Sequence, residues 1–136
     1  MAKTPLSLLE ISGRIRNCSL PKVDLVVGIA TGGIVPASLI AHQLACDLRI
    51  VHVNYRDEAN QPRYAEPALL KLPPLPALTS LRILLVDDVS VTGKTLQSLT
   101  RWLEGHTVHT LVMKGKADIV LFPEVSTCVQ WPWKVE

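Results

Sequence analysis

Two adjacent aspartates, Asp87 and Asp88, follow a run of apolar residues in the stretch ILLVDDVSVTGKTL, residues 83–96. The loop after them consists of small and hydroxylated residues around a glycine: Ser90, Val91, Thr92, Gly93, Lys94 and Thr95. Unpaired N–H groups at the start of a helix, together with threonine hydroxyls, bind a phosphate group. Neighbouring carboxylates accept hydrogen bonds from the vicinal hydroxyls of a sugar and help to hold Mg²⁺. The stretch therefore indicates a site for ribose 5-phosphate.

The same stretch admits two other interpretations. A lone pair of aspartates would more simply cap a helix or solvate the end of a strand, and the attached loop is what favours a ligand site. The loop also differs from that of nucleoside triphosphatases. Their pattern needs a glycine five residues before Gly93, and the residue there is Asp88. An ordinary nucleoside triphosphatase is therefore disfavoured.

A second glycine-rich loop lies in the stretch GIATGGIVPA, residues 28–37. Gly32 and Gly33 would expose N–H groups at the start of the following helix. Taken alone, these glycines would serve a tight turn equally well. Together with the first loop, they suggest a ligand that carries phosphate at two ends.

Composition restricts the class of protein. A chain of 136 residues with 48% hydrophobic residues fits one globular domain over residues 1–136. Its formal charge of +2 gives no strong case for a nucleic-acid or membrane partner. The N-terminus does not resemble a secretory signal, and no stretch reaches the roughly 18 apolar residues that cross a bilayer, so we expect a cytoplasmic protein. Cys18, Cys46 and Cys128 are too scattered for a disulfide framework or a zinc site.

Apolar periodicity predicts alternating strands and helices. The expected strands cover residues 23–30, 48–55, 81–86, 107–114, 117–122 and 126–131. The expected helices cover residues 5–18, 33–46 and 92–105, with Thr4 capping the first, Pro5 at its first position, and Trp102 packed in the core beneath the last. Such alternation predicts an α/β fold, a parallel sheet flanked by helices, in which ligands bind at the carboxyl ends of the strands. Asp87 and Asp88 should then lie at an exposed strand end.

The segment from about residue 55 to 80 interrupts this alternation. It contains five of the ten prolines and has no steady period, although it has room for a short strand or helical turn. A proline-rich segment of this length inside a compact domain is more typical of a lid than of a linker. Arg56, Arg63 and Lys71 are candidates to reach a bound phosphate when the lid closes.

The two loops resemble a known family. LLVDDVSVTGKTL is similar to the phosphoribosyl pyrophosphate motif of the type I phosphoribosyltransferases, and GIATGGIVPA resembles their pyrophosphate loop. Lys114 and the closing TCVQWPWK make the chain most similar, within that family, to bacterial xanthine-guanine and hypoxanthine phosphoribosyltransferases. The resemblance implies a Rossmann-like fold with a hood, Mg²⁺ as cofactor, and phosphoribosyl pyrophosphate and a nucleobase as partners. It also implies a homodimer or a higher homo-oligomer.

The resemblance further implies roles for individual residues. Asp87 and Asp88 would be catalytic, holding the ribose and, directly or indirectly, the metal. The residues from Ser90 to Thr95 would bind the 5-phosphate. The pyrophosphate would lie against Thr31, Gly32 and Gly33, and the base against Lys114, Cys128 and Val129.

Three residues depart from the pattern of 6-oxopurine enzymes. Val91 stands where they usually have an aspartate that serves the purine N7 as general base, Cys128 replaces a stacking tryptophan, and Thr31 replaces an arginine. The leading hypothesis is a phosphoribosyltransferase for a 6-oxopurine. A non-catalytic sensor of phosphoribosyl pyrophosphate or a nucleotide, and a transferase with another acceptor such as a pyrimidine, remain alternatives. Trp131 and Trp133 would line either the base pocket or an interface.

Overall fold

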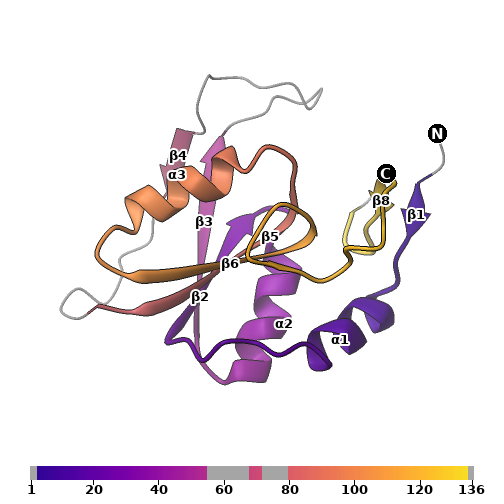
Figure 1. Ribbon diagram of the computed structural model, residues 1–136, viewed down its shortest axis with the longest axis horizontal. Coiled ribbons are helices and arrows are strands. Elements are labelled where there is room, and N and C mark those ends of the chain that lie inside the picture. The colour runs from indigo at the N-terminus through magenta and orange to yellow at the C-terminus, as the bar shows by residue number, and fades with distance from the viewer. Residues whose placement is uncertain (1–2, 55–67, 72–79, 135–136) are drawn as a thin grey trace.

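Six strands form the central sheet of the protein (Figure 1). The computed structural model describes residues 3–54, 68–71 and 80–134. The strands are β2 (Leu25–Ala30), β3 (Asp47–Asn54), β4 (Ala68–Lys71), β5 (Arg82–Ser90), β6 (Thr107–Gly115) and β7 (Ile119–Val120). They lie in the order β4-β3-β2-β5-β6-β7, and every pairing is parallel except that of β3 with β4. The predicted α/β class with a parallel sheet is confirmed.

Helices cover both faces of this sheet, which explains why its inner strands are almost continuously apolar. The helices are α1 (Leu8–Arg16), α2 (Ile34–Leu44) and α3 (Lys94–Trp102). Along β5, side chains alternate between the faces: Leu84 and Val86 pack in the core with α1 and α2, and Ile83 and Leu85 pack in the core with α3. This alternation continues to the aspartates that end the apolar run, so they are directed to opposite faces.

The first helix begins later than the sequence predicts. Its N-cap is Ser7, not Thr4, and a capping box joins Ser7 to Glu10, with N–H to oxygen distances of 3.0 and 3.2 Å. Thr4 and Pro5 instead form the short strand β1, parallel to β8 (Val129–Gln130). The prediction was wrong because a pairing across the length of the chain draws Thr4 away from the helix.

Trp102 is a second correction. It lies at the last position of α3 and is 37% exposed, whereas Leu99 and Leu103 fill the core beneath the helix. Successive helix positions are about 100° apart. Because Leu103 faces the core, the side chain of Trp102 is turned away from the sheet.

Two contacts tie the C-terminal segment to the N-terminal elements. The guanidinium of Arg14 donates to both oxygens of Glu124 at 3.0 and 2.7 Å and to the Leu121 carbonyl at 2.5 Å. It also lies over the ring of Phe122, 4.3 Å from the centroid, and holds the pKa of Glu124 down to about 2. Further along, β1 pairs with β8. Residues 121–130 are thereby fixed beside the carboxyl end of the sheet.

The predicted lid lies mostly outside the described residues, Arg56 and Arg63 among them. Its described part is β4, the short strand for which the segment has room, and Lys71 is the last residue of that strand. The three cysteines are free thiols, as the sequence predicts. Within the described ranges, no helix has the length and apolar character needed to span a membrane.

Candidate active site

Asp87 and Asp88 lie inside β5 and not at an exposed strand end. The strand continues to Ser90 because its pairing with β6 continues, with Val89 opposite Lys114 and Ser90 opposite Gly115. Both aspartates are half-buried as a result. Alternation along β5 directs Asp87 toward the α3 face and Asp88 toward the α2 face. Each carboxylate is thus positioned next to a different loop.

Burial and mutual repulsion define the electrostatics of the two aspartates. Burial, followed by the charge of Asp88, raises the pKa of Asp87 well above its ordinary range. The Asp88 N–H donates to Asp87 Oδ1 at 2.8 Å, and the Val89 N–H donates to Asp88 Oδ1 at 2.8 Å. Hydroxyl donors or a cation would stabilise the charged form of two carboxylates this close together. As hard oxygen donors they fit Mg²⁺, which is commonly held by one or two carboxylates together with substrate phosphates.

The loop after β2 is pressed against Asp88. A Cβ added to Gly32 would lie 2.2 to 2.6 Å from the atoms of the Asp88 carboxylate, so only glycine permits this approach. The Ala30–Thr31 peptide bond is cis. The Gly33 N–H donates to Ile29 O at 2.8 Å, which corrects the prediction that Gly33 offers its N–H to a ligand. Gly33 is buried against backbone and serves packing, so Thr31 and Gly32 are the exposed part of this loop.

We expect Gly32→Ala to weaken the binding of phosphoribosyl pyrophosphate by about tenfold or more, because the new methyl group displaces the Asp88 carboxylate. Isothermal titration calorimetry measures the effect. Gly13→Ala is the matched control, since a Cβ at this position in α1 meets nothing within 4 Å. It should leave ligand affinity unchanged and stabilise α1 by about 0.5–1 kcal/mol. Equal affinities for both variants would refute the close contact of loop and carboxylate.

The loop after β5 forms the start of α3. Ser90 is buried at the end of the strand, where its carbonyl accepts the Lys116 N–H at 2.8 Å. The chain then turns at Gly93, with φ of 85°, a conformation natural to glycine. Gly93 caps α3 without a side-chain hydrogen bond of its own, and the Lys94 N–H donates to the Thr92 hydroxyl at 3.3 Å. The helix start that follows is the kind of place where backbone N–H groups and the helix dipole bind an anion. This geometry suits Thr92 to Thr95 as the phosphate-binding part of the stretch.

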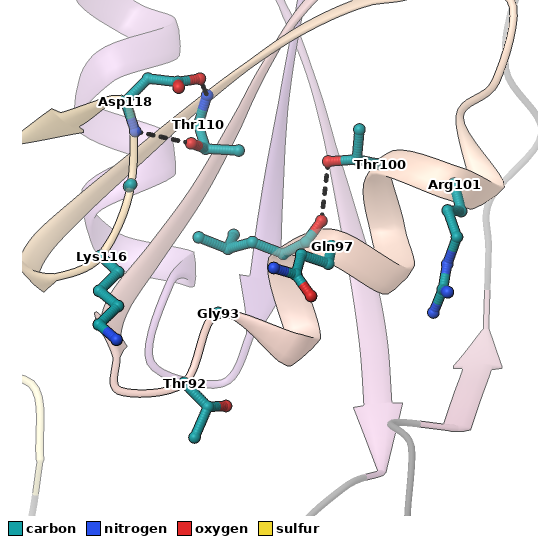
Figure 2. Close-up of a pocket in the computed structure, with 10 residues that line it drawn as sticks. Thr92, Gly93, Gln97, Thr100, Arg101, Thr110, Lys116 and Asp118 are labelled. Carbon is teal, nitrogen blue, oxygen red and sulfur yellow. Dashed lines mark hydrogen bonds between the residues drawn. The ribbon is translucent and has the colours of Figure 1, made fainter.

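A groove of about 530 Å³ lies beside this turn, and Figure 2 shows the residues that line it. It is lined by α3, through Gln97, Thr100 and Arg101, by the turn after β6, through Lys116 and Asp118, and by Thr92 and Gly93 of the loop itself. The groove runs along the helix and does not include the aspartates. The groove therefore meets the candidate site at Thr92 and Gly93 and leaves out its carboxylates.

The predicted base-binding residues come from two elements that meet. Lys114, at the end of β6, donates from Nζ to the Thr127 carbonyl at 2.5 Å. Cys128 is exposed, and Val129 is only 8% exposed because its side chain packs in the core. Lys114 and the chain at 127–128 are thus brought together, whereas Val129 has only its backbone to offer a ligand.

Two residues of the site were not predicted from the sequence. Trp133 and Lys134 line a cavity of about 290 Å³ together with Thr31, Gly32 and Asp88. The sequence leaves Trp133 open between the base pocket and an interface and assigns no role to Lys134. No spacing signal connects them with the loop after β2, because about a hundred residues separate the two segments.

An α/β protein with two helix-start loops around a carboxylate pair at the carboxyl ends of its strands has the architecture of a nucleotide or sugar-phosphate binder. The sequence model of the phosphoribosyl transferase domain matches residues 3–122. The chain therefore belongs to the phosphoribosyltransferase family, as its motifs predict.

Solved structures of this fold include purine phosphoribosyltransferases. One from Pyrococcus horikoshii is 24% identical, with a TM-score of 0.80, and the match covers 100% of this chain and 97% of that one. The xanthine-guanine-hypoxanthine enzyme of Helicobacter pylori is 16% identical, with a TM-score of 0.74 over 98% and 95% of the chains. A hypothetical protein from Neisseria gonorrhoeae with bound ppGpp is 22% identical, with a TM-score of 0.71 over 99% and 92%. These likenesses establish the fold.

One curated relative is the transcriptional regulator GfcR of Methanocella arvoryzae, 29% identical over 105 residues. The match covers 72% of this chain, which spans about half the length of that relative.

Proposed function

We propose that the protein transfers ribose 5-phosphate from phosphoribosyl pyrophosphate to a nucleobase, a 6-oxopurine, and releases pyrophosphate. The observation that supports this most is the close approach of Gly32 to Asp88, which line the same cavity. Asp87 is directed to the other face of the sheet, where the second loop begins α3. Two anion-binding loops on either side of a carboxylate pair match a sugar that has phosphate at both ends.

The residues of the chain divide the reaction between them. N–H groups at the start of α3 hold the 5-phosphate and fix the position of the ribose. Asp87 and Asp88 accept the ribose hydroxyls and stabilise the positive charge that develops on the ring as its bond to pyrophosphate breaks. Asp87 and Asp88 would hold Mg²⁺, directly or indirectly, and the bound ion would neutralise charge on the pyrophosphate leaving group. Thr31 and Gly32 face the cavity in which that group would lie.

Lys114 supports a base that carries a carbonyl oxygen. Its ammonium group can only donate, and it now donates to the Thr127 carbonyl. A purine 6-oxo group is an acceptor of the same kind, whereas the amino group of adenine is a donor. The purine and xanthine-guanine-hypoxanthine transferases of the same fold agree with this choice. We also propose that the protein is a homodimer or a higher homo-oligomer, which analytical ultracentrifugation tests.

A screen of nucleobases with phosphoribosyl pyrophosphate and Mg²⁺ tests the proposal directly. We expect pyrophosphate release with hypoxanthine, guanine or xanthine, and slower or no release with adenine and pyrimidines. A thermal-shift titration should show stabilisation by phosphoribosyl pyrophosphate, since a ligand of the folded state stabilises by mass action. Preference for adenine or a pyrimidine would overturn the purine assignment, and the absence of any stabilisation at millimolar ligand would overturn the site.

A second candidate function is a non-catalytic sensor of phosphoribosyl pyrophosphate or a nucleotide. The side chain of Val91 cannot accept a proton, so it cannot act as general base. The curated relative is named a transcriptional regulator. The same screen separates the two functions. Tight binding without release of pyrophosphate with any base would favour the sensor.

A further inference from the structure

The cavity beside Asp88 has an uneven charge distribution. Of the residues that line its 290 Å³, Asp88 and Lys134 are the charged ones, and the others are Thr31, Gly32, Ile34, Val35 and Trp133. Asp88 repels an anion. Within the part of the chain that the structure describes, Lys134 is thus the cationic side chain in this wall.

Packing fixes the segment that bears Lys134. Trp131 is only 4% exposed in the main core, and Trp133 stacks on it with ring centroids 5.1 Å apart and planes at 9°. The Lys134 N–H donates to the Trp131 carbonyl at 3.2 Å, which closes a turn. Among residues 3–54, 68–71 and 80–134, none forms a salt bridge or hydrogen bond with the Lys134 amine. The backbone is anchored while the amine stays available.

We propose that Lys134 binds the diphosphate group of the ligand, an inference that rests on the proposed function. A diphosphate carries several negative charges. Among the described residues that line the cavity, Thr31 offers it a hydroxyl and none besides Lys134 offers a cation. Lys134 supplies that charge from the C-terminal segment. Because Thr31 and Lys134 line the same cavity, an arginine at position 31 would place an equivalent charge on the facing wall.

The experiment compares ligands with and without a diphosphate. Wild type and Lys134→Ala are titrated calorimetrically with phosphoribosyl pyrophosphate, inorganic pyrophosphate and ribose 5-phosphate, each with Mg²⁺. Removing the Lys134 side chain should weaken the binding of phosphoribosyl pyrophosphate and of pyrophosphate by about tenfold, the usual effect of losing one charge-assisted hydrogen bond. The affinity for ribose 5-phosphate should not change. The loss should shrink as salt is added.

Two further variants serve as controls. Lys22→Ala removes the same charge from an exposed residue before β2, at the end of the sheet remote from the aspartates, and should bind all three ligands as wild type does. Thr31→Arg introduced into Lys134→Ala should recover most of the lost pyrophosphate affinity. Recovery by a relocated charge is a result that a purely structural role of Lys134 would not produce.

Two results would overturn the inference: Lys134→Ala binding pyrophosphate as tightly as wild type, or losing ribose 5-phosphate equally. Failure of the proposed function looks different. A wild-type protein that binds pyrophosphate through Lys134 but transfers ribose to no base would refute the transferase and support Lys134 as a diphosphate ligand. If the wild-type protein transfers ribose to a base and Lys134→Ala binds pyrophosphate as tightly as wild type, this inference alone would be refuted.

Discussion

Replacing Asp87 and Asp88 together by asparagine should lower transfer from phosphoribosyl pyrophosphate by about 10³-fold, while the unliganded protein becomes more stable at neutral pH. An amide is a weaker acceptor for the ribose hydroxyls than a carboxylate and does not offset positive charge on the ring. Loss of a single group that stabilises transition-state charge typically costs about 10²–10³-fold, and here two such groups are removed. Ligand binding should weaken as well, because the pair fits Mg²⁺.

The stability change follows from the pKa of Asp87, which burial and Asp88 raise well above its ordinary range. The folded protein therefore keeps a proton that the unfolded chain releases from about pH 4 upward. The contribution of Asp87 to the free energy of unfolding is fully present below that pH and is lost as the pH rises toward the folded-state pKa. Asparagine has no proton to lose, so Asp87→Asn removes this decline.

Thermal unfolding in EDTA from pH 2 to pH 8 measures the difference. The Tm of Asp87→Asn should exceed that of wild type increasingly as the pH rises. Asp24→Asn is the control of opposite sign. The pKa of Asp24 is lowered to about 2 by its hydrogen bonds to Arg82, so its contribution is present above its ordinary pKa and is lost as the pH falls toward 2. Asp24→Asn should leave transfer unchanged.

An Asp87→Asn protein that is no more stable than wild type at pH 7 would contradict the assigned burial. Unchanged transfer by the double variant would contradict the role of the carboxylates. The combination expected here, with function lost and stability gained, is typical of groups that a binding site holds in an unfavourable environment.

Local patterns predicted the elements of this fold well because each strand carries its own signal. The apolar run at residues 81–86 is long enough to indicate a strand that is buried on both faces, and this signal does not depend on which strands lie beside it. Where β5 ends was not predictable in this way. Asp87 and Asp88 have poor strand propensity, and they are strand residues because β6 continues to pair beside them. Strand length here is a property of the pair of strands and not of either sequence.

The candidate site was predictable to the extent that it lies in continuous stretches. Gly32 and Gly33 look alike in the sequence, yet one approaches a carboxylate and the other is buried against backbone. That distinction depends on which side of the loop faces β5. Lys134 lies in the same cavity only through the packing of Trp131 and Trp133, and long-range packing leaves no periodicity in a sequence. Motifs thus located the loops, and tertiary contacts distinguish the individual residues within them.

Restoring a carboxylate at position 91 should raise turnover with oxopurines by about 10- to 100-fold. The purine N7 must lose or share its proton during transfer, and valine cannot accept one. General-base catalysis is typically worth about 10²–10⁴-fold, and a newly introduced group recovers only part of that. Val91 is 67% exposed just beyond β5, two residues after Val89, which pairs with Lys114. A new side chain at position 91 therefore has space on the acceptor side.

Steady-state rates with hypoxanthine and guanine measure the effect. Val91→Asn is the matched control, because it has the size of aspartate without its basicity, and it should not accelerate transfer. Affinity for phosphoribosyl pyrophosphate should be nearly the same in both variants. Lys114→Ala should lower oxopurine turnover about tenfold or more and leave that affinity nearly unchanged, since the base loses a cationic donor.

Each of these rates tests the acceptor assignment in a different way. If Val91→Asp and Val91→Asn behave alike, proton removal at this position is not what limits turnover. If Lys114→Ala transfers ribose to oxopurines as fast as wild type, the ammonium group remains with the Thr127 carbonyl in the complex. The purine assignment would then lose its main support. An accelerated Val91→Asp together with a slowed Lys114→Ala would place the 6-oxo side of the base at β6 and its N7 at the loop after β5.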